Sequence, residues 1–153
     1  MTEIKIENIV RSNNQTELSF LELPKKIENN TLFERKKIFL EKLRSKTKPN
    51  SYKRYLGTPL RYAGGKTLAV GHIVNFLSDN IKRVVSPFLG GASVEIAIVK
   101  ELGLEVIGYD IFDILINYWH YQINEPKKLA NKLKNFKPTK AEYSRVKEIM
   151  KKH

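Results

Sequence analysis

The sequence has no cysteine and only three histidines among its 153 residues. Without cysteine the chain has neither a disulfide framework nor a thiolate metal site, and three scattered histidines do not favour a metal cluster. No apolar run reaches the roughly 18 residues that a membrane-spanning helix needs. The N-terminus also lacks the basic-then-apolar layout of a signal peptide. These absences predict a soluble, cytoplasmic protein that binds no metal and no membrane.

Positive charge is abundant but unevenly placed along the chain. The formal net charge is +12, and residues 25–54 and 127–153 each carry +8 of it, whereas residues 1–24 and 55–126 each carry −2. Clustered Lys and Arg side chains attract a phosphate backbone. They are also typical of solvated helix faces in a lysine-rich protein, so the charge pattern leaves both interpretations open.

The pattern of apolar residues predicts alternating helices and strands within one domain of ordinary length. We expect helices over residues 31–46, 67–78, 93–102, 112–123 and 126–135, strands over 83–86 and 105–109, and a last helix opened by a capping box at Thr139 and Glu142. Strand, glycine turn, helix and strand form a βαβ pattern, which predicts a parallel sheet. Weak order and at most one strand are expected in residues 1–30. We divide the chain into a basic, partly helical extension (1–57) and a main domain (58–153).

The first chemical motif is the segment Arg-Tyr-Ala-Gly-Gly-Lys-Thr at residues 61–67. Two glycines before a helix let the backbone approach a ligand, and the helix start with Lys66 favours an anion such as a carboxylate or phosphate. The ending Gly-Lys-Thr is shared with phosphate loops of nucleotide hydrolases. That motif needs a further glycine where Leu60 stands, so we favour a different anion-binding loop.

Two further motifs follow the predicted strands. The glycine turn at residues 87–92 comes after one strand and opens a helix, and Asp110 ends the next strand about 20 residues later. Dinucleotide and S-adenosylmethionine pockets form at such a turn, and an acidic strand end binds ribose hydroxyls. The simpler alternatives are a glycine turn required for packing and an aspartate that caps a helix.

Together the three motifs resemble the D12 class (Dam-like) of adenine-specific DNA N6-methyltransferases, over about residues 59–135. Residues 61–66 look like the N-terminal cofactor motif of that family, residues 86–93 like its Pro-Phe-x-Gly loop, and residues 108–110 like its acidic strand end. The resemblance implies an α/β, partial Rossmann-like S-adenosylmethionine-dependent methyltransferase fold with a helical, basic N-terminal extension. It also implies DNA as the substrate, as in restriction–modification systems.

The resemblance implies S-adenosylmethionine as cofactor and indicates which residues bind it. By analogy, Lys66 offers a cation to the cofactor carboxylate, and Asp110 accepts hydrogen bonds from the ribose. Gly90 and Gly91 let the backbone pass under the adenosine. The ten residues implied in cofactor binding are Tyr62, Ala63, Gly64, Gly65, Lys66, Phe88, Gly90, Gly91, Ser93 and Asp110.

One element of the family pattern is missing. The family carries an (Asp/Asn)-Pro-Pro-Tyr element that holds the target amino group, but none of the six prolines here is adjacent to another. The segment that reads target bases is missing too, and Ser86 stands where an acidic residue usually precedes Pro-Phe. We therefore assign no catalytic residue. We expect this chain to be the cofactor-binding part of such an enzyme, in a truncated or split form that is inactive alone. A second chain that carries the catalytic half would complete it.

Basic residues near the N-terminus are the candidates for DNA contact: Arg35, Lys36, Lys37, Arg44, Lys53 and Arg54. Two alternatives to the methyltransferase part stay open. One is a non-catalytic module that binds DNA or docks a partner. The other is a degenerate remnant that melts with poor cooperativity, because a sheet of two or three strands leaves an open edge.

The aromatic residues of the predicted helix over 112–123 and the acidic residue Glu95 are expected to have structural rather than catalytic roles. Trp119 and its aromatic neighbours in residues 112–123 are expected to pack in the core rather than stack on bases. Glu95, one turn into a predicted helix, is expected to cap that helix or to be solvated rather than to act in catalysis.

Overall fold

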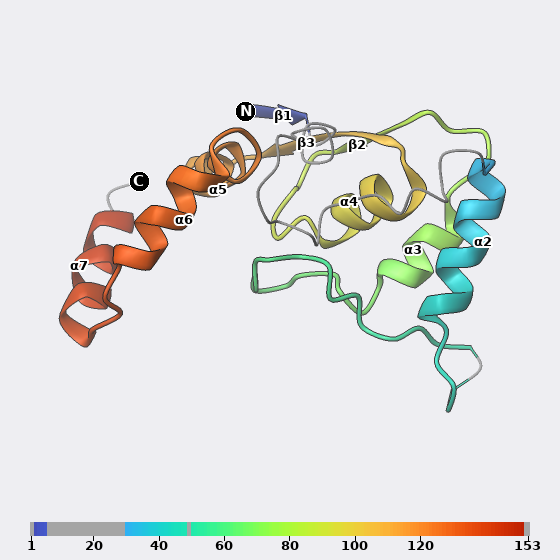
Figure 1. The fold of residues 1–153 in the computed structure, drawn as a ribbon, viewed down its shortest axis with the longest axis horizontal. Coiled ribbons are helices and arrows are strands. Elements are labelled where there is room, and N and C mark those ends of the chain that lie inside the picture. The colour runs from blue at the N-terminus through green and yellow to red at the C-terminus, as the bar shows by residue number, and fades with distance from the viewer. Residues whose placement is uncertain (1, 6–29, 49, 152–153) are drawn as a thin grey trace.

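The computed structural model describes residues 2–5, 30–48 and 50–151 (Figure 1). The order expected for residues 6–29 lies outside this part of the chain. The elements are β1 (Thr2–Lys5), α2 (Leu32–Leu43), α3 (Val70–Phe76), β2 (Arg83–Ser86), α4 (Ser93–Ala97), the π-helical turn η1 (Ile98–Leu102), β3 (Glu105–Asp110), α5 (Asp113–Asn124), α6 (Pro126–Asn135) and α7 (Lys140–Met150).

The sheet has three described strands in the order β1-β3-β2. β2 and β3 are parallel, with Val85 opposite Ile107, as the βαβ pattern predicts. β1 adds to the other side of β3 in the antiparallel direction, with Thr2 opposite Asp110. The α/β class is therefore confirmed, and the N-terminal segment, for which at most one strand was expected, contributes β1. Because β2 and β3 are the one parallel pair among the described strands, a full Rossmann-like sheet remains an expectation.

The helix predicted over residues 93–102 is present but changes type partway. It begins as α4 and continues as η1, and it ends at Gly103, whose φ of 68° is the left-handed conformation that glycine adopts readily. All five residues 95–99 are buried, so the helix is covered on every side. It therefore lies in the interior of the domain, between the sheet and the helices α2 and α3 (Figure 1).

Several element ends differ from the predicted ones by a few residues. α3 starts at Val70 because residues 66–69 form a turn instead, in which the Ala69 amide donates to the Lys66 carbonyl oxygen (2.8 Å). α2 stops at Leu43, where the Arg44 amide caps the last turn. Half of the capping box predicted at Thr139 is present. The Thr139 side chain accepts from the Glu142 amide, but the Thr139 amide donates to the Lys137 carbonyl oxygen and the Glu142 carboxylate accepts from Arg145.

Helix α2 is joined to the rest of the core. Its Phe39, Leu40 and Leu43 belong to the same buried apolar cluster as the core residues of α3, α4, η1 and α5. The Arg35 guanidinium donates to the Leu102 carbonyl oxygen at the end of η1 (2.6 Å). Lys36 donates to the Leu77 carbonyl oxygen and forms an ion pair with Asp79 (2.9 Å). The division of the chain at residue 57 stays a prediction, and α2 shares a core with residues on both sides of it.

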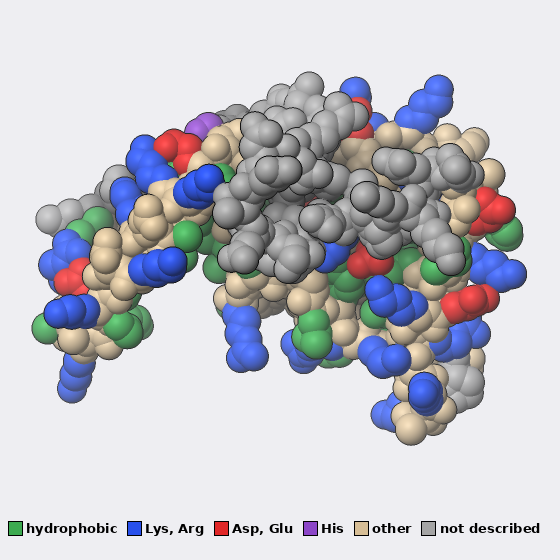
Figure 2. Space-filling view, viewed as in Figure 1, with side chains coloured by type: hydrophobic (Ala, Val, Ile, Leu, Met, Phe, Trp, Pro, Cys, Tyr) green, Lys and Arg blue, Asp and Glu red, His purple; other side chains and the backbone are tan. Residues whose placement is uncertain are grey.

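Helices α6 and α7 lie at the opposite end of the molecule from α2 (Figure 1). Neither helix has a buried residue. Lys and Arg side chains gather along them and again around α2 (Figure 2). The described parts of the two basic segments, residues 30–54 without residue 49 and residues 127–151, therefore occupy two separate ends of the molecule.

Candidate functional site

The three sequence motifs meet around one cavity of about 340 Å³. All ten residues implied in cofactor binding line it, although they come from three separate segments of the chain. Four residues that were not predicted line it as well: Leu89, Ala92, Val94 and Glu95. The structure thus brings the candidate residues together, while their role in binding stays a prediction.

Asp110 holds the glycine turn in place at the end of β3. Its Oδ2 accepts from the Gly90 amide (2.8 Å), and its Oδ1 accepts from the Phe112 amide at the start of α5 (3.0 Å). Each carboxylate oxygen has two lone pairs, so both can accept a further hydroxyl group. Asp110 is not the N-cap of α5, since that position is Phe112 and carries no side-chain cap, but its hydrogen bond from the Phe112 amide ties the strand end to the start of the helix.

The turn itself adopts a strained backbone that its neighbours support. Gly90 and Ala92 both have φ near 50°, a region that is unfavourable for alanine. The Gly90 carbonyl oxygen accepts from the Trp119 indole nitrogen (2.9 Å), and Trp119 is only 1% exposed. The expectation that Trp119 packs in the core is confirmed, and the residue also anchors the turn.

The first motif packs directly on the second through Tyr62. A Cβ atom built on Gly91 would lie 2.8 Å from the Tyr62 Cβ, so glycine is required for this approach. The Thr58 hydroxyl donates to the Gly91 carbonyl oxygen (2.7 Å) and fixes the same contact. Lys66 is exposed and donates to the Gly64 carbonyl oxygen (2.7 Å), which leaves its charge at the rim of the cavity.

Glu95 differs from its expected place, since it is 9% exposed and lines the cavity. Its Oε1 accepts from the Ser86 hydroxyl at 2.6 Å. Burial raises the pKa of Glu95, and hydrogen bonds from Ser86 and from backbone groups of Val94 and Glu95 oppose that rise. The expectation of a solvated residue is wrong because this turn is covered on all sides. The available signal was a glutamate followed directly by four apolar residues.

Glu95→Gln is expected to stabilise the protein near neutral pH. Because the folded pKa lies above the ordinary value of 4.5, the folded protein binds the proton more tightly than the unfolded chain. The free energy of unfolding therefore falls as the pH rises from 4.5 through the raised pKa, and glutamine lacks this loss. We expect the variant to melt about 2–4 °C higher at pH 7, with a smaller difference near pH 4, in thermal scans. A difference that does not change with pH would contradict this.

The six cations proposed for DNA contact fall into two groups. Arg35 and Lys36 are half-buried and donate to backbone carbonyl oxygens inside the fold. The other four are exposed: Lys37, Arg44, Lys53 and Arg54. Of these, Arg54 donates to the hydroxyl of Thr67, the last residue of the first motif (3.2 Å). DNA contact stays a prediction for all six.

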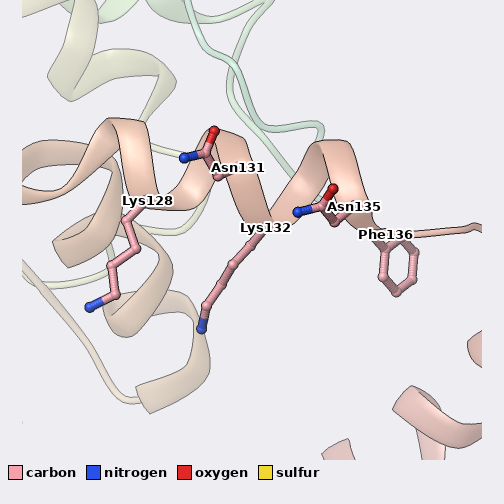
Figure 3. A pocket seen from close by; sticks show the side chains of 5 residues that line it. All are labelled: Lys128, Asn131, Lys132, Asn135 and Phe136. Carbon is pink, nitrogen blue, oxygen red and sulfur yellow. The ribbon is translucent and has the colours of Figure 1, made fainter.

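A second cavity, of about 600 Å³, lies along α6 and contains none of the predicted residues. Lys128 and Lys132 extend from the same side of the helix, and Phe136 lies just beyond its end (Figure 3). Asn131 and Asn135 complete the lining. All five side chains are exposed, so this cavity is a shallow surface feature rather than an enclosed site.

The chain is similar to one known protein family across the residues that line the first cavity. In the described part of the chain, no helix combines the length and apolar character of a membrane span, and no group of His, Cys, Asp and Glu suits a metal ion. Searches among curated proteins and among solved structures gave no match. The model of one family, the D12 class N6 adenine-specific DNA methyltransferases, matches residues 62–153, which include the cavity-lining residues of all three motifs. More than half of the chain is matched, so the chain belongs to the D12 class N6 adenine-specific DNA methyltransferase family.

Proposed function

We propose that this chain binds S-adenosylmethionine in the cavity at the glycine turn and is the cofactor-binding part of a DNA adenine-N6 methyltransferase. The family acts on DNA and implies a methyl donor. The observation that carries the proposal is the meeting of three separate motifs around one cavity, with Asp110 holding the turn. The volume of about 340 Å³ lies within the range of small-molecule sites.

The lining residues match the chemical groups of the proposed cofactor. Among the described residues that line the cavity, Lys66 is the one cation. It suits the α-carboxylate, and Asp110 suits the ribose hydroxyls. Tyr62 and Phe88 are large exposed aromatic side chains, 40% and 82% exposed, that can cover the adenine. When bound, S-adenosylmethionine supplies a methyl group on a sulfonium, and these residues bind and orient it.

The 153 residues lack the (Asp/Asn)-Pro-Pro-Tyr element that would hold the amino group of the target adenine. Adenine must leave the duplex before its amino nitrogen can react. The 153 residues contain no adjacent prolines, and therefore no Asp-Pro-Pro-Tyr element. We propose that methyl transfer requires this element from further polypeptide, such as a second chain, and that these residues are inactive alone. Residues 58–153 are the proposed cofactor-binding part and residues 1–57 its basic extension, with the exposed cations near α2 contacting DNA phosphates.

Calorimetric titration with S-adenosylmethionine tests the proposal. We expect saturable binding by the wild type and a rise of the Kd by about tenfold or more in Asp110→Asn. The neutral asparagine side chain has one oxygen acceptor instead of two, so it forms weaker hydrogen bonds to the glycine turn and to the ribose hydroxyls. Asp113→Asn is the matched control, since Asp113 is exposed on α5 and does not line the cavity. Equal affinities of the wild type and Asp110→Asn for S-adenosylmethionine would show that Asp110 does not bind the cofactor.

The same protein incubated with labelled S-adenosylmethionine and adenine-containing DNA is expected to transfer no methyl group. Substantial transfer would contradict the need for further polypeptide. DNA binding without any cofactor binding would instead support the non-catalytic module, and absence of both would support the degenerate remnant.

A further inference from the structure

Glu95 is an unusual residue for the interior of this protein. Ser93 and Glu95 are the two buried polar side chains in the part of the chain that the structure describes, and Glu95 alone of them is ionisable. Burying a carboxylate is unfavourable unless a positive charge or several hydrogen bonds compensate it. The hydrogen bonds are present, but within the described ranges no Lys, Arg or His forms an ion pair with Glu95.

The Glu95 carboxylate, which has hydrogen bonds but no ion-pair partner among the described residues, lies where a ligand would bind. Glu95 lines the same cavity as Lys66 and Asp110. The Asp110 carboxylate already accepts hydrogen bonds from the Gly90 and Phe112 amides. The Glu95 carboxylate accepts from the Ser86 hydroxyl and from backbone amides of its own helical turn. A buried negative group at a cavity wall that forms no ion pair with any described residue favours a cationic ligand group there.

We propose that Glu95 receives the α-ammonium of the cofactor's methionine part, an inference that rests on the proposed binding of S-adenosylmethionine. The cofactor carries two cationic groups, a sulfonium and an ammonium. A sulfonium has no hydrogen to donate, whereas an ammonium donates three hydrogen bonds and so compensates a buried carboxylate better. Lys66 and Glu95 then bind the two ends of the same amino-acid group, the carboxylate and the ammonium.

Ser86 positions the carboxylate for this role. Its hydroxyl lies 2.6 Å from Glu95 Oε1, at the last residue of β2, and so ties the carboxylate of α4 to the sheet. Because the two side chains meet, an acid at position 86 would place its charge close to where the Glu95 carboxylate is now. The proposal therefore predicts that an acid at position 86 can replace Glu95 in binding the ammonium, if position 95 carries the hydroxyl instead.

Calorimetry with three ligands tests the assignment. S-adenosylmethionine has both cationic groups, S-adenosylhomocysteine has the ammonium alone, and 5′-deoxy-5′-methylthioadenosine has neither. In Glu95→Gln we expect the Kd to rise about tenfold or more for the first two ligands and to stay within about twofold for the third. The double variant Ser86→Asp/Glu95→Ser is expected to recover most of the lost affinity. Glu101→Gln is the control, because this half-buried glutamate contacts Tyr55 and Lys42 outside the cavity.

Each other outcome contradicts the proposal in a recognisable way. Equal losses for all three ligands would show a purely structural role for Glu95. A loss for S-adenosylmethionine but not for S-adenosylhomocysteine would assign Glu95 to the sulfonium. Unchanged affinity in Glu95→Gln, with binding by the wild type intact, would refute the inference and leave the proposed function standing. No binding of S-adenosylmethionine by the wild type would refute both.

Discussion

Trp119→Ala is expected to lower the free energy of unfolding by about 3–5 kcal/mol, the largest effect on stability of any change considered for this protein. Trp119 is 1% exposed and is the largest fully buried side chain of the described residues. Its removal leaves a cavity between α5 and the glycine turn and deprives the Gly90 carbonyl oxygen of its indole donor. Urea unfolding followed by circular dichroism measures the change.

Two further substitutions separate the contributions of Trp119. Trp119→Phe keeps much of the apolar volume but removes the indole N–H, so we expect a smaller loss of stability together with weaker cofactor binding from a looser turn. Tyr143→Ala removes a 67% exposed aromatic side chain from α7 and is expected to change stability by less than about 0.5 kcal/mol. A Trp119→Ala protein as stable as the wild type would show that Trp119 is not a core residue.

Gly91→Ala is expected to produce the largest loss of cofactor affinity, with a Kd raised by about 30-fold or more. The new Cβ would lie 2.8 Å from the Tyr62 Cβ, which is next to the backbone and moves only if the whole first motif moves. The displacement would separate Tyr62 and Lys66 from the glycine turn and open the cavity. A misplacement of about 1 Å is enough for losses of this size in preorganised sites. Calorimetry with S-adenosylmethionine measures the effect.

Gly103→Ala is the control for this substitution. Its new Cβ would approach Arg35 Nη1, the end of a flexible side chain, and its left-handed backbone is unfavourable for alanine, but neither residue lines the cavity. We expect a modest loss of stability and an affinity close to that of the wild type. If both alanine variants bind the cofactor equally well, the contact between Tyr62 and Gly91 does not shape the site.

The sequence predicted the local parts of this structure well. Gly103, Pro126 and Thr139 mark helix ends through the backbone preferences and capping of single residues, and the structure places ends at all three. The turn and the acidic strand end were found in the same way. Each of these signals depends on residues that are neighbours in the chain.

Features that depend on distant parts of the chain were not predictable from local patterns. The antiparallel pairing of Thr2 with Asp110 joins residues more than 100 positions apart. Arg35 has the appearance of a surface cation in the sequence, yet it donates to Leu102. The burial of Glu95 has the same origin, because the helices that cover it come from other segments. In each case tertiary packing decides what a local pattern leaves open.

The two basic side chains that α2 directs inward also determine how this helix opens. Arg35 and Lys36 donate to carbonyl oxygens at the ends of η1 and α3, so α2 cannot separate without exposing both ends and the apolar residues below them. In amide hydrogen exchange, we therefore expect α2, α3 and η1 to lose their protection together. The basic N-terminal helix therefore belongs to the wall of the domain rather than to a detachable arm.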